Sequence, residues 1–268
     1  MIGVAEPTLD ELTQFARTLA RAARHETLAL FAQDMPVDDK NAAGAFDPVT
    51  EADRGAERVM RRLIEEAYPD HGIQGEEFSE RASSGSYCWS LDPIDGTRSY
   101  VCGLPTWVTL LGLLKDGEPV LGLIDAPRLN ETYVGHGNRA VLESDGSTTP
   151  LVVSNCKRLA EARLSTTDPG LFVGPAREAF DRLRSGSRTV RYGHDGYGYA
   201  RLAAGTLDLV VECGLKPHDY NALIPVVRGA RGVFGDWHGG VDFAEGNVIA
   251  ASTPQLYEAA VNLMRAAC

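Results

Sequence analysis

The first third of the chain carries two patterns typical of amphipathic helices. Residues 8–33 place apolar side chains at helical spacing, with Thr8 suited to the N-cap and acidic residues in the first turn. A polar stretch at 38–48 follows and predicts a loop or a tight hairpin. A second helix is predicted from about Thr50 to Ala67, before Pro69. Its inward-facing residues are predicted to be Val59, Met60, Leu63 and Ile64.

The pattern then changes to short apolar or alternating runs, which are typical of strands. KDGE at 115–118 predicts a hairpin between two of them. The runs lie at 87–91, 107–115, 119–125 and 131–134. The polar segment 143–150 is rich in turn formers. We therefore predict an N-terminal α+β part at 1–145 and a C-terminal α/β part at 146–268.

The second part alternates strand-like and helical runs, which favours an α/β arrangement. The strand-like runs lie at 151–154, 162–167, 189–193, 206–212 and 248–252. The helical runs lie at 176–184, 197–205, 219–230 and 254–267. Pro254 is suited to the first position of the last helix.

Composition narrows the class of protein. The 268 residues are 44% hydrophobic and 24% charged, which is ordinary for a globular domain. A net charge of −11 argues against general nucleic-acid or anionic-membrane binding, which needs basic patches. An acidic protein binds a phosphorylated ligand best through a metal ion or a few local cations.

Cellular location is predicted from what the sequence lacks. No uncharged apolar run reaches the ~20 residues of a membrane span, and no signal segment is apparent. The five cysteines form no C-x-x-C pair, which argues against a disulfide framework or a structural zinc site. We therefore expect a cytoplasmic protein.

Four acidic clusters carry the candidate chemistry: DPVTEAD at 47–53, GEE at 75–77, DPIDGT at 92–97, and the segment around Asp219. DPIDGT follows an apolar strand directly and so presents two carboxylates at its end. Gly96 permits close approach to a ligand, and the N–H groups that follow Thr97 favour an anion. Carboxylates beside an anion site need a cation, and hard oxygen ligands suit Mg²⁺.

Structural roles compete with this interpretation at each cluster. Asp53 stands three residues after Thr50, so it can belong to a helix N-terminal box. Asp219 can cap its helix, and Glu76 with Glu77 can be a solvated pair. To explain all the clusters without a metal, each of these structural roles would have to hold independently. A shared metal site explains the clusters together and is therefore favoured.

These motifs resemble the inositol monophosphatase-like superfamily. The resemblance rests on GEE, WSLDPIDGT, and the late Asp at a helix followed by GARG, and it spans positions 47 to 232. It implies a Mg²⁺-dependent, lithium-sensitive phosphatase with two or three Mg²⁺ per site. The implied fold is a layered αβαβα sandwich, shared with fructose-1,6-bisphosphatase, and the implied assembly is a homodimer.

The resemblance also implies roles for individual residues. Glu76, Asp92, Asp95, Asp219 and the carbonyl of Ile94 match metal ligands. Gly96 and Thr97 match the phosphate-binding turn, and the ligands Asp92, Ile94, Asp95 and Asp219 border the same substrate site. Asp53, Thr97 and Glu76 match catalytic positions, with the Thr97 hydroxyl held by Asp53 to orient the attacking water. Lys40 is a looser match to a basic residue on the metal-site loop.

Finer features resemble the histidinol-phosphatase branch, through SYVCGLPTWVTLLGLLKDGEPVLGLIDAP, RYGHDGYGYARLAAGTLDLVVE and GLKPHDYNALIPVV. Histidinol phosphate carries an amine and an imidazole, so its pocket should offer acids. Glu212 matches a substrate-contacting acid, and Asp195 stands where inositol-specific members carry a small residue. Asp195 can instead cap a helix, and Arg191 can be a surface residue. The predicted substrate site also includes Gly193 and His194.

The sequence therefore predicts an enzyme that hydrolyses histidinol phosphate in histidine biosynthesis. The alternative within the same class is a phosphatase for inositol phosphate, fructose bisphosphate or a 3′-phosphoadenosine nucleotide. A non-catalytic metal-dependent sugar-phosphate binding protein is the alternative from another class. We expect a small phosphorylated substrate, with no nucleic-acid or membrane partner.

Overall fold

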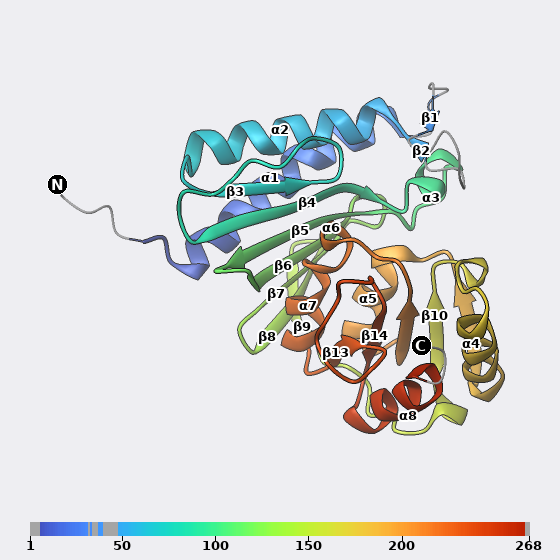
Figure 1. The fold of residues 1–268 in the computed structure, drawn as a ribbon. Coiled ribbons are helices and arrows are strands. Elements are labelled where there is room, and N and C mark those ends of the chain that lie inside the picture. Colours follow the sequence, from blue (N-terminus) through green and yellow to red (C-terminus); the bar gives the residue numbers. More distant parts are fainter. Residues whose placement is uncertain (1–5, 32, 34–36, 40–47, 266–268) are drawn as a thin grey trace.

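The computed structural model describes residues 6–31, 33, 37–39 and 48–265, and it forms five layers (Figure 1). Two helices cover one face of a large sheet, and a second set of helices fills the space between that sheet and a smaller one. Two further helices cover the outer face of the smaller sheet. The αβαβα sandwich predicted from the sequence is confirmed.

The outer helices at the N-terminal end are α1 (Leu9–Leu30) and α2 (Glu51–Ala67). Each begins with a capping box, in which the N-cap threonine and an acidic residue three positions later bond to one another's backbone. The two helices form where predicted, although α1 ends at Leu30 rather than at residue 33. The short strands β1 (Asp38–Asp39) and β2 (Pro48–Val49) pair antiparallel between them.

The larger sheet has seven strands within the described residues, in the order β3-β4-β5-β6-β7-β8-β9. Its strands β3 and β4 are parallel and all other neighbours are antiparallel. The bounds are β3 Gly72–Gly75, β4 Tyr87–Asp95, β5 Val108–Lys115, β6 Glu118–Ala126, β7 Glu131–His136, β8 Arg139–Ser144 and β9 Ser147–Pro150. The short helix α3 (Thr97–Val101) follows β4.

The smaller sheet has five strands within the described part of the chain, in the order β11-β10-β12-β14-β13. The bounds are β10 Arg163–Thr166, β11 Thr189–Tyr192, β12 Leu209–Glu212, β13 Val233–Asp236 and β14 Val248–Ala251. The middle helices are α5 (Asp195–Ala203), α6 (Pro217–Tyr220) and α7 (Leu223–Gly229), and the outer ones are α4 (Pro175–Gly186) and α8 (Pro254–Met264).

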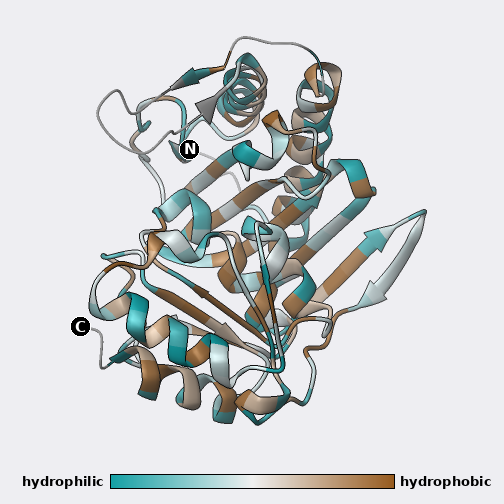
Figure 2. Cartoon of the chain, turned by 90° about the vertical axis from the view of Figure 1, so that its right-hand side faces the viewer, coloured by the Kyte–Doolittle hydropathy of each residue, from teal (hydrophilic) through white to brown (hydrophobic). Residues whose placement is uncertain are grey.

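Three apolar cores hold these layers together. One lies between α1, α2 and the larger sheet, one between the two sheets, and one between the smaller sheet and α4 with α8. Brown, apolar segments follow the strands of both sheets in Figure 2. The middle core draws on both halves of the sequence, and the division predicted at 145/146 falls in the turn between β8 and β9.

Two predicted elements differ from the structure. Residues 151–154 form no strand: Val153 donates its N–H to the carbonyl of Ala230, at the end of α7, and not to a neighbouring strand. The helix predicted at 219–230 is divided into α6 and α7. Pro225 has no N–H to donate to the carbonyl four residues earlier, so a continuous helix would lack that bond.

A row of glycines brings α7 close to the larger sheet. Gly112, Gly122 and Gly135 stand opposite one another on β5, β6 and β7. A Cβ added to Gly122 would lie 1.9 Å from the carbonyl oxygen of Ala222, and one added to Gly135 would lie 2.4 Å from the Cα of Val226. This close approach places α6, and with it Asp219, over the sheet near the end of β4.

Candidate active site

The DPIDGT segment forms the end of β4 and the turn into α3. The pairing of β4 with β5 is irregular between Asp92 and Asp95, which re-aims the side chains at the strand end. Asp92 is buried, and one of its oxygens accepts the N–H of Ile94 at 3.1 Å. Gly96 has φ +86°, a left-handed conformation that disfavours residues with a Cβ. A Cβ there would also lie 2.9 Å from a carboxylate oxygen of Asp195.

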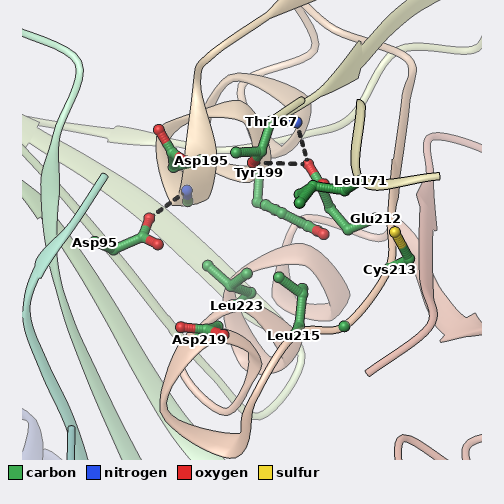
Figure 3. Close-up of a pocket in the computed structure, with 12 residues that line it drawn as sticks. Asp95, Thr167, Leu171, Asp195, Tyr199, Glu212, Cys213, Leu215, Asp219 and Leu223 are labelled. Carbon is green, nitrogen blue, oxygen red and sulfur yellow. Dashed lines mark hydrogen bonds between the residues drawn. The ribbon is translucent and has the colours of Figure 1, made fainter. Parts of the chain in front are cut away.

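Three predicted metal ligands converge in space. Asp92, Asp95 and Asp219 each offer a carboxylate oxygen, and these oxygens all lie within 4.8 Å of one another. Asp95 accepts a short hydrogen bond from the N–H of Gly196 at the start of α5 (Figure 3). Asp219 accepts the N–H of Lys216 at 2.6 Å, so it also caps α6. Asp219 therefore serves as a helix cap, which was the alternative prediction, and also belongs to the acidic cluster.

Glu76 reaches the same cluster from the loop after β3. Its backbone N–H donates to the carbonyl of Leu91 at 3.2 Å, and its carboxylate interacts with that of Asp92. The buried Glu57 on α2 holds this loop by accepting the N–H of Glu77 at 2.8 Å. The structure therefore does not support the alternative that Glu76 and Glu77 are a solvated surface pair.

The electrostatics of the cluster suit a hard cation. Burial, together with the charge of Glu76 and of the neighbouring aspartates, raises the pKa of Asp92 well above its usual range. Burial and nearby acids likewise raise the pKa of Asp95 and of Asp219. Four acids packed this closely repel one another when ionised. Carboxylate oxygens with a nearby backbone carbonyl are the donor set that Mg²⁺ prefers, so these residues fit the implied ion.

Asp53 lies buried in the α2 capping box, as the structural alternative predicted. Its Oδ2 accepts the N–H and the hydroxyl of Thr50 at 2.8 and 2.6 Å. Its Oδ1 is buried and has no hydrogen-bond partner among the described residues. Burial chiefly, with a smaller effect of the Glu76 charge, raises the pKa of Asp53 to about 6. The cap therefore occupies one oxygen and leaves the other available.

The expected contact between Asp53 and Thr97 is not formed. The Thr97 hydroxyl donates instead to the carbonyl of Ile94 at 2.9 Å. That carbonyl oxygen is also the expected backbone metal ligand, and it has a second lone pair. The hydroxyl therefore stands beside the cluster but is not bonded to Asp53.

A pocket of about 480 Å³ adjoins the cluster (Figure 3). Asp95 and Asp195 lie at one side of it and Glu212 at the other, with Tyr199 between them. The oxygens of Glu212 accept the hydroxyl of Thr166 and the N–H and hydroxyl of Thr167. The remaining lining residues are Leu171, Gly196, Cys213, Gly214, Leu215, Asp219 and Leu223.

Burial opposes the ionisation of both Asp195 and Glu212 in this pocket. Glu212 is 2% exposed, and burial, together with the Asp195 charge, raises its pKa to about 8 although three hydrogen bonds oppose this. Burial also raises the pKa of Asp195 to about 6. Asp195 adopts φ +47° at the first position of α5, and the N-cap of that helix is His194, whose side chain makes no capping bond to it. Asp195 is therefore not the helix cap offered as its alternative.

Seven residues predicted for the substrate site are not among those that line this pocket. They are Asp92, Ile94, Gly96 and Thr97 at the end of β4, and Arg191, Gly193 and His194 before α5. Arg191 is exposed on β11, at the edge of the smaller sheet. His194 shares a hydrogen bond of 3.0 Å with Ser165, and Gly193 precedes it. Lys40 lies outside the described residues. Arg191 therefore matches its surface alternative.

Sequence reasoning missed Thr167 and Tyr199. Tyr199 follows Asp195 by four residues, so the two share a face of α5, and this spacing was a usable signal. Thr167 follows β10 directly and reaches the pocket only because β10 pairs with β12, which carries Glu212. No local pattern in the sequence indicates that pairing.

Comparison with known proteins gives the family. The model of the inositol monophosphatase family matches residues 8–267. The chain belongs to this family. It is therefore a phosphatase that acts on small phosphorylated substrates, as the sequence predicted.

The most similar relatives carry different names. The chain is 41% identical over 239 residues to the bifunctional phosphatase IMPL2 of Arabidopsis thaliana, covering 88% of this chain and 67% of that protein. It is 34% identical over 265 residues to a histidinol-phosphatase of Streptomyces coelicolor, covering 93% and 95%. A solved inositol monophosphatase from Zymomonas mobilis matches with TM-score 0.85 and 36% identity, covering 97% and 100%. The predicted resemblance to this superfamily and to its histidinol-phosphatase branch is confirmed.

The structure also bears on the predictions about disulfides and membrane spans. The four cysteines among the described residues, Cys88, Cys102, Cys156 and Cys213, are free. No helix in the described part of the chain has the length and apolar character that crossing a membrane requires.

Proposed function

We propose that this phosphatase is Mg²⁺-dependent and hydrolyses histidinol phosphate to histidinol and phosphate, as a step of histidine biosynthesis. One observation carries the proposal: the partly buried cluster of Asp92, Asp95 and Asp219 opens onto a pocket that the acids Asp195 and Glu212 also line. The first feature suits a divalent cation and a phosphate. The second suits the cationic alcohol that such a substrate releases.

The family resemblance divides the ligands into two groups. Glu76, Asp92 and the Ile94 carbonyl would hold one Mg²⁺, and Asp92, Asp95 and Asp219 a second. Bound there, Mg²⁺ supplies Lewis-acid stabilisation of the phosphoryl oxygens and a more acidic water. Hydrolysis of phosphate monoesters is among the slowest uncatalysed reactions, so such stabilisation is needed.

Residues of the chain would handle the proton of the attacking water. The free Oδ1 of Asp53 is a buried acceptor, and the Thr97 hydroxyl stands beside the Ile94 carbonyl. A rotation of the Thr97 side chain would exchange the bond to Ile94 for one to Asp53 and turn the hydroxyl oxygen toward a water. The raised pKa of Asp53, about 6, suits a group that accepts a proton near neutral pH.

The turn after β4 would seat the phosphate. Gly96 is the N-cap of α3 and has no side chain to cap the first N–H groups of that helix. These N–H groups are donors for phosphate oxygens. The phosphate would thus lie between the turn and the carboxylate cluster.

The acids of the pocket support the choice of histidinol phosphate. A buried carboxylate gains from a cationic partner, because burial without one opposes its ionisation. Histidinol phosphate offers an amine and an imidazole, whereas inositol phosphate offers only neutral hydroxyls at that end. Asp195 and Glu212 therefore favour the cationic substrate.

Inositol-1-phosphate is the second candidate substrate. The Zymomonas mobilis inositol monophosphatase shares 36% of residues over nearly the whole chain, which favours it. A non-catalytic binding protein is disfavoured by Asp53, because a buried carboxylate oxygen without a partner serves no purpose in simple binding.

A substrate panel tests the proposal. We would measure kcat/KM with Mg²⁺ for histidinol phosphate, inositol-1-phosphate, fructose-1,6-bisphosphate and 3′-phosphoadenosine 5′-phosphate. We expect histidinol phosphate to exceed the others by at least about tenfold, which corresponds to roughly 1.4 kcal/mol. The variant Glu212→Gln should reduce this preference while retaining activity on inositol-1-phosphate. An advantage of tenfold or more for inositol-1-phosphate in the wild type would overturn the histidinol assignment.

We also propose a cytoplasmic homodimer. The free thiols of the described cysteines suit a reducing compartment. Light scattering of the purified protein tests the dimer, and a mass near 28.9 kDa would contradict it.

A further inference from the structure

Two buried polar residues outside the metal-ligand set join the segments that carry Asp92 and Asp219. We propose that Ser90 and Asn221 are positioning residues that hold Asp219 over the end of β4 and thereby set the affinity for divalent cations. This inference rests on the metal site of the proposed function. It adds two residues, neither of them a metal ligand, whose hydrogen bonds link β4 to α6; we call these bonds the Ser90–Asn221 bracket.

The bracket consists of two hydrogen bonds between β4 and α6. The amide nitrogen of Asn221 donates to the hydroxyl oxygen of Ser90 at 3.2 Å. The Ser90 hydroxyl lies 3.4 Å from the carbonyl oxygen of Pro217, to which it donates. Ser90 therefore contacts α6 on both sides of Asp219, because Pro217 precedes Asp219 by two residues and Asn221 follows it by two.

Ser90 is equally well placed on its own strand. It precedes Asp92 by two residues on β4, and residues two apart on a strand share a face. The side chain of Ser90 thus points to the same side of the sheet as the side chain of Asp92. A bond from Ser90 to α6 fixes the height of α6 over Asp92.

The pair is closed off from water. Ser90 is 1% exposed and Asn221 is 4% exposed. Loss of either partner would leave the other polar group buried without its bond, which costs about 1–3 kcal/mol. A buried pair of this kind therefore resists sliding of α6 along the sheet.

The sheet leaves room for Asn221 at this place only because the next strand carries glycine. Gly112 on β5 stands opposite Ser90. A Cβ on Gly112 would lie 3.1 Å from the Cβ of Asn221 and 3.1 Å from the backbone nitrogen of Ala222. The glycine allows α6 to approach the sheet closely, and the Ser90–Asn221 bond sets the position of α6 on the sheet.

Asp219 needs contacts outside its own helix to hold it in place. Helix α6 has four residues, and so short a helix is not stable by itself. The bond from the Lys216 N–H to Asp219 is internal to this segment, so it cannot determine the distance from Asp219 to β4. Contacts between α6 and β4 must do so, and the Ser90–Asn221 bracket supplies them.

A calorimetric titration of the full-length protein with Mn²⁺ tests the inference. The variants are Ser90→Ala, Asn221→Ala and the double variant. Partners that orient metal ligands typically contribute about 10–100-fold in metal affinity. Ser90→Ala breaks both hydrogen bonds, whereas Asn221→Ala breaks only the bond to Ser90. We expect Ser90→Ala to raise the Mn²⁺ dissociation constant by about tenfold and Asn221→Ala to raise it by no more than that. The double variant should match Ser90→Ala, because Ser90 takes part in both bonds.

A matched control separates positioning from loss of stability. Ser252→Ala also removes a buried serine hydroxyl, which donates to the carbonyl of Cys156 at 3.3 Å in another part of the fold. This variant should lower the melting temperature without changing the Mn²⁺ dissociation constant. A purely structural role for Ser90 and Asn221 would give the same result as this control.

The outcomes are distinct. Unchanged Mn²⁺ affinity in Ser90→Ala and Asn221→Ala, with a wild type that binds Mn²⁺, overturns the positioning role and leaves the proposed function intact. A multiplicative loss in the double variant also overturns the bracket, because the two residues would then act separately. A wild type that binds no Mn²⁺ would instead refute the metal site on which the inference rests.

Discussion

Carboxylate oxygens of Asp92 and Asp219 lie within 4.8 Å of one another, although the two residues come from a strand of the larger sheet and a helix packed on its inner face. Neither residue reaches the other through local structure. The glycine row on β5, β6 and β7 brings α7 onto the sheet, and α6, which precedes α7, carries Asp219 to the end of β4. The account of function depends on this convergence.

Asp92→Asn should remove activity and weaken metal binding while the fold persists. Asparagine retains the oxygen that accepts the Ile94 N–H but removes a charge from the centre of the cluster. We expect activity to fall by at least about a hundredfold. Thermal melting in EDTA should give an unchanged or higher melting temperature, because one repelling charge is gone. Normal activity in this variant would refute the site assignment.

Asp53→Asn distinguishes a catalytic role from a helix cap. The amide oxygen can still accept the bonds from Thr50, so the capping box survives, while the free anionic oxygen is lost. We expect kcat to fall by about 10²–10⁴, as for loss of a general base, with little change in the Mg²⁺ concentration for half-maximal rate. A fall in melting temperature with an unchanged kcat would instead leave Asp53 as a cap alone.

The pH dependence of stability should reveal the pocket acid Glu212. Its pKa in the folded protein, about 8, is higher than the ordinary 4.5 of a glutamate, so the folded state binds the proton more tightly. Its contribution to stability is complete below about pH 4.5 and is lost as the pH rises toward 8. We expect Glu212→Gln to flatten the decline in melting temperature between pH 5 and 8 for the metal-free protein. A wild-type melting temperature that rises steadily over this range would contradict the raised pKa.

Arg231 occupies a backbone conformation that suits glycine. It follows α7 with φ +69°, in the left-handed region. A left-handed conformation costs a residue with a Cβ roughly 1–2 kcal/mol, of which the greater flexibility of unfolded glycine offsets a part. We expect Arg231→Gly to raise the free energy of unfolding by about 0.5–1 kcal/mol, seen in denaturant titration. Arg231→Ala, which keeps a Cβ, should show no such gain.

The Tyr199 hydroxyl should lower the stability of the ligand-free protein and strengthen substrate binding. Its hydroxyl is buried in the pocket wall and has no hydrogen-bond partner in the part of the chain that the structure describes, which disfavours the ligand-free protein. We expect Tyr199→Phe to raise the free energy of unfolding of that form by about 1 kcal/mol and to raise KM for the preferred substrate. A lower melting temperature would show that the hydroxyl is bonded within the protein.

The outer helices and most strands were predictable because their signals are local. The Thr8–Glu11 and Thr50–Asp53 boxes mark both helix starts, and Pro254 begins α8 as expected. The helix predicted at 219–230 was wrong in its continuity, because apolar spacing continues across the position where Pro225 lacks a donor. The strand predicted at 151–154 was wrong because an apolar run does not show whether a neighbouring strand is there to pair with it.

The metal cluster was predictable from motifs, whereas the pocket was less so. DPIDGT presents Asp92 and Asp95 through its own turn, so their proximity follows from sequence. The walls formed by Thr167 and Glu212 depend on the pairing of β10 with β12, and that pairing is set by packing between distant segments. The sequence left two roles open for Arg191 for the same reason, because it does not show that β11 lies at the edge of its sheet.

The convergence of the acidic residues is tested most directly by an anomalous difference map from crystals soaked in Mn²⁺. The account predicts strong peaks bounded by Asp92, Asp95 and Asp219, with Glu76 and the Ile94 carbonyl oxygen completing the contacts. Crystals that show these carboxylates turned apart, with no anomalous peak between them, would contradict it.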